Sequence, residues 1–178
     1  ISRSKKNYVD PELKKNYEIV QIKKDISKAK NIIFADYIIY CAISKNYAED
    51  SRGVKNYCKL AKKYHKNSSI VYTSSGAVYG KQSKKINKID DLQKVNPKNI
   101  FSKTKKRYGL LKIKNEKIFK KLSNANIKVC AARCFAFVGR HLPLDSNYVI
   151  GNFIKSIIFK KSIEIKSKTK VIRTYMHS

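Results

Sequence analysis

The 178 residues suffice for one sizeable hydrophobic core, and 42% of them are hydrophobic, which is ordinary for a folded protein. The formal net charge of +29 is extreme, but only six of the 41 basic residues are arginine and the lysines are dispersed, so we predict no specific nucleic-acid partner. No apolar run reaches the ~20 residues that a membrane-spanning helix needs, and we therefore predict no membrane partner.

Short apolar runs alternate with helix-length amphipathic segments along the chain. Such runs are typical of parallel strands that are covered on both faces, and they predict an α/β fold with a doubly wound, parallel, Rossmann-type sheet. The expected strands are Glu18–Ile22, Tyr37–Ile43, Ser69–Thr73 and Ile127–Val138.

Two segments have the apolar spacing of helices that cover such a sheet. They run from Asn46 to Lys66 and from about Lys103 to Leu122, and the asparagines of Asn124–Asn126 mark a stop after the second. The polar stretch Gly80–Ile100 is predicted to be a surface loop that shapes a ligand cleft.

The four cysteines, Cys41, Cys58, Cys130 and Cys134, form no CxxC pair and have no histidine at metal-ligand spacing. We therefore predict no metal site. Free apolar cysteines are typical of a reducing compartment, which favours a cytoplasmic location.

Tyr108 and Lys112 lie four residues apart on the second predicted helix, and therefore on one face. A lysine ammonium one turn away favours the phenolate, so such a tyrosine can take a proton from an alcohol. In isolation the pair more often indicates only an exposed lysine beside a tyrosine at the core edge.

The second candidate is the cluster of small residues that follows a predicted strand, Ser74-Ser75-Gly76-Ala77. Small residues let a ligand approach the backbone, and the Ser75 hydroxyl can bind a reacting oxygen. A plain polar turn is the alternative.

Read in order, these segments resemble the extended short-chain dehydrogenase/reductase family, in its nucleotide-sugar epimerase/dehydratase branch. The motifs that carry the resemblance span the chain: Asp25-Ile26, Asp36–Ala42, Ser74–Gly80, Tyr108 and Lys112 with Glu116, Arg133–Gly139, Leu142–Asp145, Ile150–Ile154 and Arg173–Tyr175.

The resemblance implies a catalytic set and a cofactor site for NAD or NADP. Ser75 would bind the sugar hydroxyl that is oxidised, Tyr108 would be the base, and Lys112 would hold the nicotinamide ribose. The remaining residues implied to bind the cofactor are Arg3, whose place favours NADP, Asp25 and Ile26 beside the adenine, Ala42 along the cofactor and Phe135 near the nicotinamide.

The resemblance also implies a nucleotide-sugar substrate, with Asn152 and Arg173 at its nucleotide part and the guanidinium at a diphosphate. A homodimer through helices that include the Tyr108 helix is implied as well. Residues 1–130 would be a partial NAD(P)-binding Rossmann domain that lacks its first strand and glycine-rich loop, so the chain would be N-terminally truncated. Residues 131–178 would hold the last Rossmann strand and the incomplete start of a small C-terminal substrate domain.

Departures from the family pattern narrow the implied reaction. Gly76 and Ala77 stand where dehydratases carry an acidic pair, and Ala136 and Arg140 replace a usual asparagine and proline. Hydride transfer at sugar C4, as in an epimerase or reductase, is therefore favoured over dehydration or decarboxylation. From other classes, an inactive Rossmann-like fragment and a polyanion-binding protein stay as alternatives.

Overall fold

The computed structural model describes residues 1, 11–44, 46–80, 95–96, 98, 102–140, 142, 144, 148–165 and 175–177. Its internal contacts divide the chain into two compact units, Ile1–Arg133 and Cys134–Ser178, which are described separately below. Within the described residues, no helix is long and apolar enough to cross a membrane.

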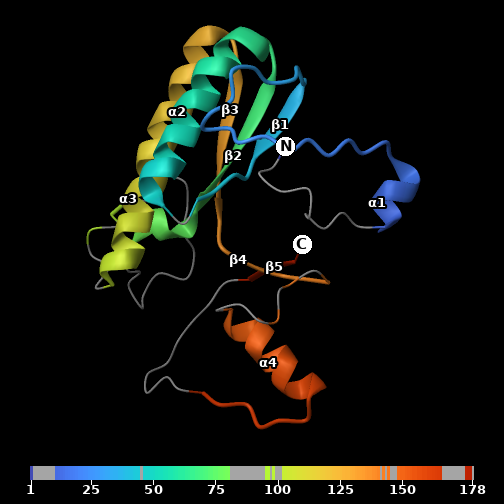
Figure 1. Cartoon of the computed structure of the whole chain (residues 1–178). Helices are drawn as coiled ribbons and strands as arrows, with labels where there is room; N and C mark the ends of the chain where they lie inside the picture. Colours follow the sequence, from blue (N-terminus) through green and yellow to red (C-terminus); the bar gives the residue numbers. More distant parts are fainter. Residues whose placement is uncertain are drawn as a thin grey trace. The chain divides into compact units, whose positions relative to one another are not determined.

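The first unit is built on a three-stranded sheet with the order β1 (Tyr37–Tyr40), β2 (Ser69–Ser75) and β3 (Lys128–Cys134). β1 and β2 are parallel, with Tyr37 opposite Ser69 and Tyr40 opposite Tyr72. Helices α2 (Tyr47–Tyr64) and α3 (Lys103–Lys120) connect successive strands and lie side by side on one face of the sheet (Figure 1). The predicted parallel, Rossmann-like α/β fold is confirmed.

Both crossover helices begin at a side-chain N-cap. The Asn46 side chain accepts hydrogen bonds from the first turn of α2, and Ser102 does the same for α3. After α3 a short 3-10 turn, η3 (Lys121–Ala125), leads to Asn126, whose φ of 62° is left-handed. An asparagine tolerates this conformation, so the predicted stop is confirmed.

Aromatic rings dominate the core between the helices and the sheet. The Phe119 ring stacks on the Tyr72 ring at a centroid distance of 4.5 Å, and the Tyr40 ring meets the Phe119 ring edge-on at 5.2 Å. The buried residues include Val54 of α2, Phe119 of α3, Leu122 of η3, and Ile70 and Tyr72 of β2. This packing fixes α3 against β2, where the candidate catalytic residues lie.

Several predicted strand boundaries are wrong. Glu18–Ile22 is not a strand, because a strand needs a partner for its backbone groups and no neighbouring strand pairs with it in the described part of the chain. β1 ends at Tyr40 rather than Ile43. The predicted strand Ile127–Val138 is interrupted at Phe135 and forms β3 and β4 (Ala136–Val138) instead.

The second unit contains β4, which pairs in parallel with β5 (Tyr175–His177), and helix α4 (Val149–Ile158). A short exposed helix, α1 (Pro11–Asn16), precedes the sheet of the first unit. Most of the predicted loop Gly80–Ile100 lies outside the described residues.

Burial separates the cysteines into two reactivity classes. Cys58 packs in the core, and burial raises the pKa of its thiol to about 12, whereas Cys41 and Cys130 are exposed. At about pH 8 a chromogenic disulfide reagent should therefore modify Cys41 and Cys130 quickly and Cys58 only after unfolding. Cys130→Ser should remove part of the fast labelling phase, and Cys58→Ala should remove the slow labelling phase. Fast labelling that disappears in Cys58→Ala would contradict this placement.

Candidate active site

Tyr108 and Lys112 lie one turn apart on the face of α3 that packs against β2. Lys112 is only 5% exposed, and its Nζ donates a hydrogen bond to the Thr73 carbonyl oxygen at 2.8 Å. The same Nζ lies 5.7 Å from the centre of the half-buried Tyr108 ring. The lysine is therefore not an exposed surface cation, and its charge is held beside the tyrosine.

Ser75 is the last residue of β2. Its Oγ accepts a hydrogen bond from the backbone N–H of Ala77 at 3.2 Å and so caps the 3-10 turn η1 (Gly76–Tyr79). The Ser75 side chain is half-buried, and α3 packs against both β2 and η1. Ser75, Tyr108 and Lys112 thus lie on contacting elements.

A cluster around Glu116 ties these elements together. The Glu116 Oε1 accepts hydrogen bonds from Ser74 Oγ and from Arg133 Nε, the latter at 3.1 Å, while Oε2 accepts from Arg133 Nη2 at 3.0 Å. This bidentate pairing raises the pKa of Arg133 above its ordinary value, so the guanidinium stays charged.

Arg133 extends the cluster to η1. Its Nη1 donates to the Tyr79 hydroxyl at 3.0 Å, and its guanidinium lies 5.0 Å from the centre of the Tyr79 ring. The cluster therefore joins β2, η1, α3 and β3 around the turn that presents Ser75. Glu116 was among the motif residues of the family resemblance, but nothing in the sequence identified Arg133 as the partner of Glu116.

Asp50 and Asn115 form a second, fully internal contact between the two helices. The Asn115 amide donates to Asp50 Oδ2 at 2.9 Å, and Asp50 Oδ1 accepts from the Ser44 backbone N–H at 3.0 Å. The contact fixes the start of α2 and the segment after β1 against the middle of α3.

The residues predicted to contact the adenine lie in a turn before β1. Asp25 Oδ1 accepts hydrogen bonds from the backbone N–H and the hydroxyl of Ser27, at 2.9 and 2.8 Å. Asn56 of α2 donates to the Ile26 carbonyl at 2.8 Å, and Ile26 packs against the core. Ala42 is exposed just after β1. Because β1 and β2 are parallel, Ala42, just after β1, and Ser75, the last residue of β2, lie at the same edge of the sheet.

Four other predicted site residues belong to the second unit or lie outside the described residues. Phe135 and Asn152 belong to the second unit, where Phe135 separates β3 from β4 and Asn152 is exposed on α4. Arg3 and Arg173 lie outside the described residues. Among the residues that the structure describes, no group of three or more His, Cys, Asp or Glu side chains could hold a metal ion.

A family model described as "NAD dependent epimerase/dehydratase family" matches residues 23–178. No curated protein matches the chain in sequence. Among solved structures, UDP-N-acetylglucosamine 4-epimerase from Methanobrevibacter ruminantium, in complex with UDP-N-acetylmuramic acid, has a TM-score of 0.68 at 21% identity over 88% of this chain and 53% of its own. UDP-glucose 4-epimerase from Thermotoga maritima, with UDP-glucose, has a TM-score of 0.69 at 15% identity over 88% of this chain and 54% of its own.

A dehydratase has a similar fold as well. dTDP-glucose 4,6-dehydratase from Bacillus anthracis, in complex with NAD, has a TM-score of 0.65 at 19% identity over 80% of this chain and 43% of its own. The chain thus spans about half the length of these structures, and at these identities the likeness concerns the fold.

Proposed function

Because the chain belongs to the NAD dependent epimerase/dehydratase family, we propose that the whole protein is a nucleotide-sugar epimerase or reductase that works by hydride transfer at sugar C4. The observation that carries the proposal is the arrangement of three side chains on β2 and α3. Lys112 is buried beside Tyr108, and Ser75 ends the strand against which that helix packs.

Each of the three residues has a separate part in the proposed reaction. Bound NAD supplies the acceptor and donor of the hydride. The Ser75 hydroxyl binds the C4 oxygen of the sugar, and the ammonium of Lys112 stabilises the phenolate form of Tyr108 and holds the nicotinamide ribose. The Tyr108 phenolate then accepts the proton of the C4 hydroxyl and becomes a phenol. The hydrogen bond from Lys112 to Thr73 keeps that ammonium in place on the sheet.

The turn η1 supports redox chemistry at C4 over elimination of water. Gly76 and Ala77 follow Ser75 directly, and neither side chain can donate or accept a proton. A nucleotide-sugar dehydratase or decarboxylase of the same family is therefore the less favoured alternative.

The remaining assignments belong to the same proposal. The cofactor, NAD or NADP, would contact Arg3, Asp25, Ile26, Ala42 and Phe135. The nucleotide of the substrate would contact Asn152 and Arg173. A cytoplasmic location and a homodimer through helices that include α3 complete the proposal, and sedimentation velocity would test the dimer.

The test is to incubate the full-length protein with a panel of UDP- and dTDP-sugars and with NAD or NADP. We expect a C4 epimer, or a 4-keto sugar reduced at C4, with no loss of water in the product mass. A product lighter by one water would support the dehydratase alternative. The proposal would be contradicted if the full-length protein bound NAD but turned over none of these sugars.

A further inference from the structure

Two side chains of α3, one turn apart, hold consecutive residues at the end of β2. The Lys112 ammonium donates a hydrogen bond to the Thr73 carbonyl oxygen at 2.8 Å, and the Glu116 carboxylate accepts one from the Ser74 hydroxyl. The next and last residue of β2 is Ser75, which the proposed function places at the C4 oxygen of the sugar. The position of Ser75 therefore depends on how firmly the two residues before it are held.

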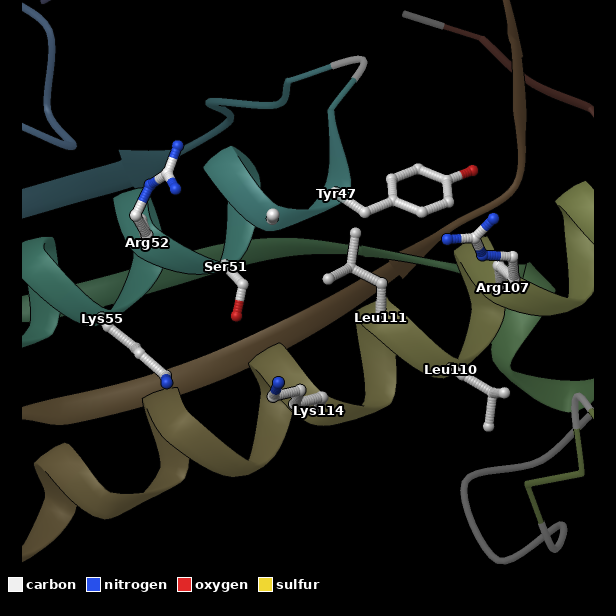
Figure 2. A pocket seen from close by; sticks show the side chains of 9 residues that line it. Tyr47, Ser51, Arg52, Lys55, Arg107, Leu110, Leu111 and Lys114 are labelled. Atoms are coloured by element: carbon white, nitrogen blue, oxygen red, sulfur yellow. The ribbon is translucent and has the colours of Figure 1, made fainter.

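These contacts come from the side of α3 that packs against the sheet. On the other side of the helix, Arg107, Leu110 and Lys114 are exposed and lie beside side chains of α2 (Figure 2). Lys112 is buried and Glu116 is largely covered. A covered charge is costly unless it is paired and hydrogen-bonded, so these two contacts to β2 hold one defined geometry.

The Ser74 hydroxyl links β2 to the cluster around Glu116. Ser74 is buried, and its Oγ donates to the Oε1 of Glu116, the oxygen that also accepts from Arg133 Nε at 3.1 Å. Arg133 in turn donates to the Tyr79 hydroxyl of η1 at 3.0 Å. The chain on both sides of Ser75 is thus tied to one carboxylate, directly through Ser74 and indirectly through Tyr79.

We propose that Ser74 is a positioning residue for the reaction, an inference that rests on the function proposed for Ser75 and Tyr108. Ser74 is buried and donates its hydroxyl hydrogen to Glu116, so it acts through its neighbour and not on the sugar. By holding the end of β2, it keeps Ser75 where its hydroxyl meets the C4 oxygen beside Tyr108. A displacement of about 1 Å at a reacting group can lower a rate about a hundredfold.

A plain structural role for the Ser74 hydroxyl is the alternative. The loss of any buried hydrogen bond destabilises a protein, so stability alone does not separate the two roles. Ser68 provides the comparison, because it is equally buried and its Oγ donates to the Ala35 carbonyl oxygen at 2.7 Å. Ser68 lies just before β2, six residues from Ser74 and about 20 Å away along the strand.

The test compares Ser74→Ala with Ser68→Ala in the full-length protein. Each substitution removes one buried hydroxyl with its hydrogen bond, so both should lower the midpoint of urea unfolding by similar amounts. We expect kcat on the preferred nucleotide sugar to fall about tenfold in Ser74→Ala, with KM and the Kd of NAD within about threefold of the parent. In Ser68→Ala, kcat should stay within about twofold of the parent.

Hydrogen exchange of one amide gives a second readout that needs no turnover. The Ala77 backbone N–H donates to Ser75 Oγ at 3.2 Å, so its exchange rate reports the order of the turn that presents Ser75. We expect this amide to exchange about tenfold faster in Ser74→Ala and within about twofold of the parent in Ser68→Ala, as measured by NMR.

The outcomes separate this inference from the proposed function. Parent-like turnover and Ala77 exchange in Ser74→Ala, while Tyr108→Phe is slow, would overturn the role of Ser74 and leave the proposed reaction standing. Equal slowing in both serine variants would also overturn that role, because the effect would then follow from lost stability. If Tyr108→Phe turned over like the parent, the proposed function would fail and the role of Ser74 in it would fail too.

Discussion

Tyr108→Phe is expected to slow turnover of the full-length protein by about 10²–10⁴-fold while it binds cofactor normally. The substitution removes only the phenolic oxygen, so the ring keeps its place beside Lys112 and the helix keeps its packing against β2. Positioned proton transfer contributes a rate factor of this size in enzymes. Initial rates on the preferred nucleotide sugar, together with calorimetric titration of NAD, would measure both effects.

Tyr64→Phe is the matched control for this prediction. Tyr64 is also a half-buried tyrosine on a crossover helix, but it lies at the end of α2 and packs against the core. Removing the Tyr64 hydroxyl should leave the turnover rate within about twofold of the parent, because this group has no part in the proton transfer. Similar rates for Tyr108→Phe and the parent would show that another group is the base.

Glu116→Leu is expected to lower the free energy of unfolding by about 3 kcal/mol. The Glu116 side chain is 13% exposed and its partner Arg133 26%, so the substitution leaves a largely covered guanidinium without its carboxylate. It also removes the acceptor of the Ser74 hydroxyl, which is buried. Urea unfolding followed by circular dichroism would measure the change.

Two further variants separate this ion pair from a general loss of charge. Glu49→Leu removes a half-buried carboxylate that accepts a hydrogen bond from the Ser44 hydroxyl, and the substitution should cost about 1 kcal/mol or less. The double variant Glu116→Leu/Arg133→Met removes both charges, so its cost should be smaller than the sum of the two single costs. Strict additivity would mean that the pair contributes nothing of its own.

The sequence predicted the parts of the fold that local pattern controls. Continuous apolar runs predicted β1 and β2, and the spacing of apolar residues predicted α2 and α3, to within a few residues at each end. Glu18–Ile22 has the same composition as a strand but does not form one, because backbone pairing depends on a neighbour and not on the segment itself. α4 was not predicted, since a short apolar run does not by itself distinguish a helix from a strand.

The candidate site was predictable only to the level of its motif residues. A four-residue spacing on one helix places Lys112 beside Tyr108, and the structure has that geometry. The hydrogen bond of Lys112 to Thr73 and the pairing of Glu116 with Arg133 join residues from different elements, 39 and 17 positions apart. Such contacts follow from tertiary packing, and no local pattern contains them.

The most direct measurement follows deuterium from the C4 position of a labelled nucleotide sugar through one turnover of the full-length protein. Hydride transfer at C4 by an epimerase predicts that the product keeps the deuterium at C4, because the carbon–hydrogen bond that is broken is formed again at the same carbon. Deuterium at C6 would support dehydration instead. Loss of the label to water would contradict hydride transfer altogether, and with it the role assigned to Ser75, Tyr108 and Lys112.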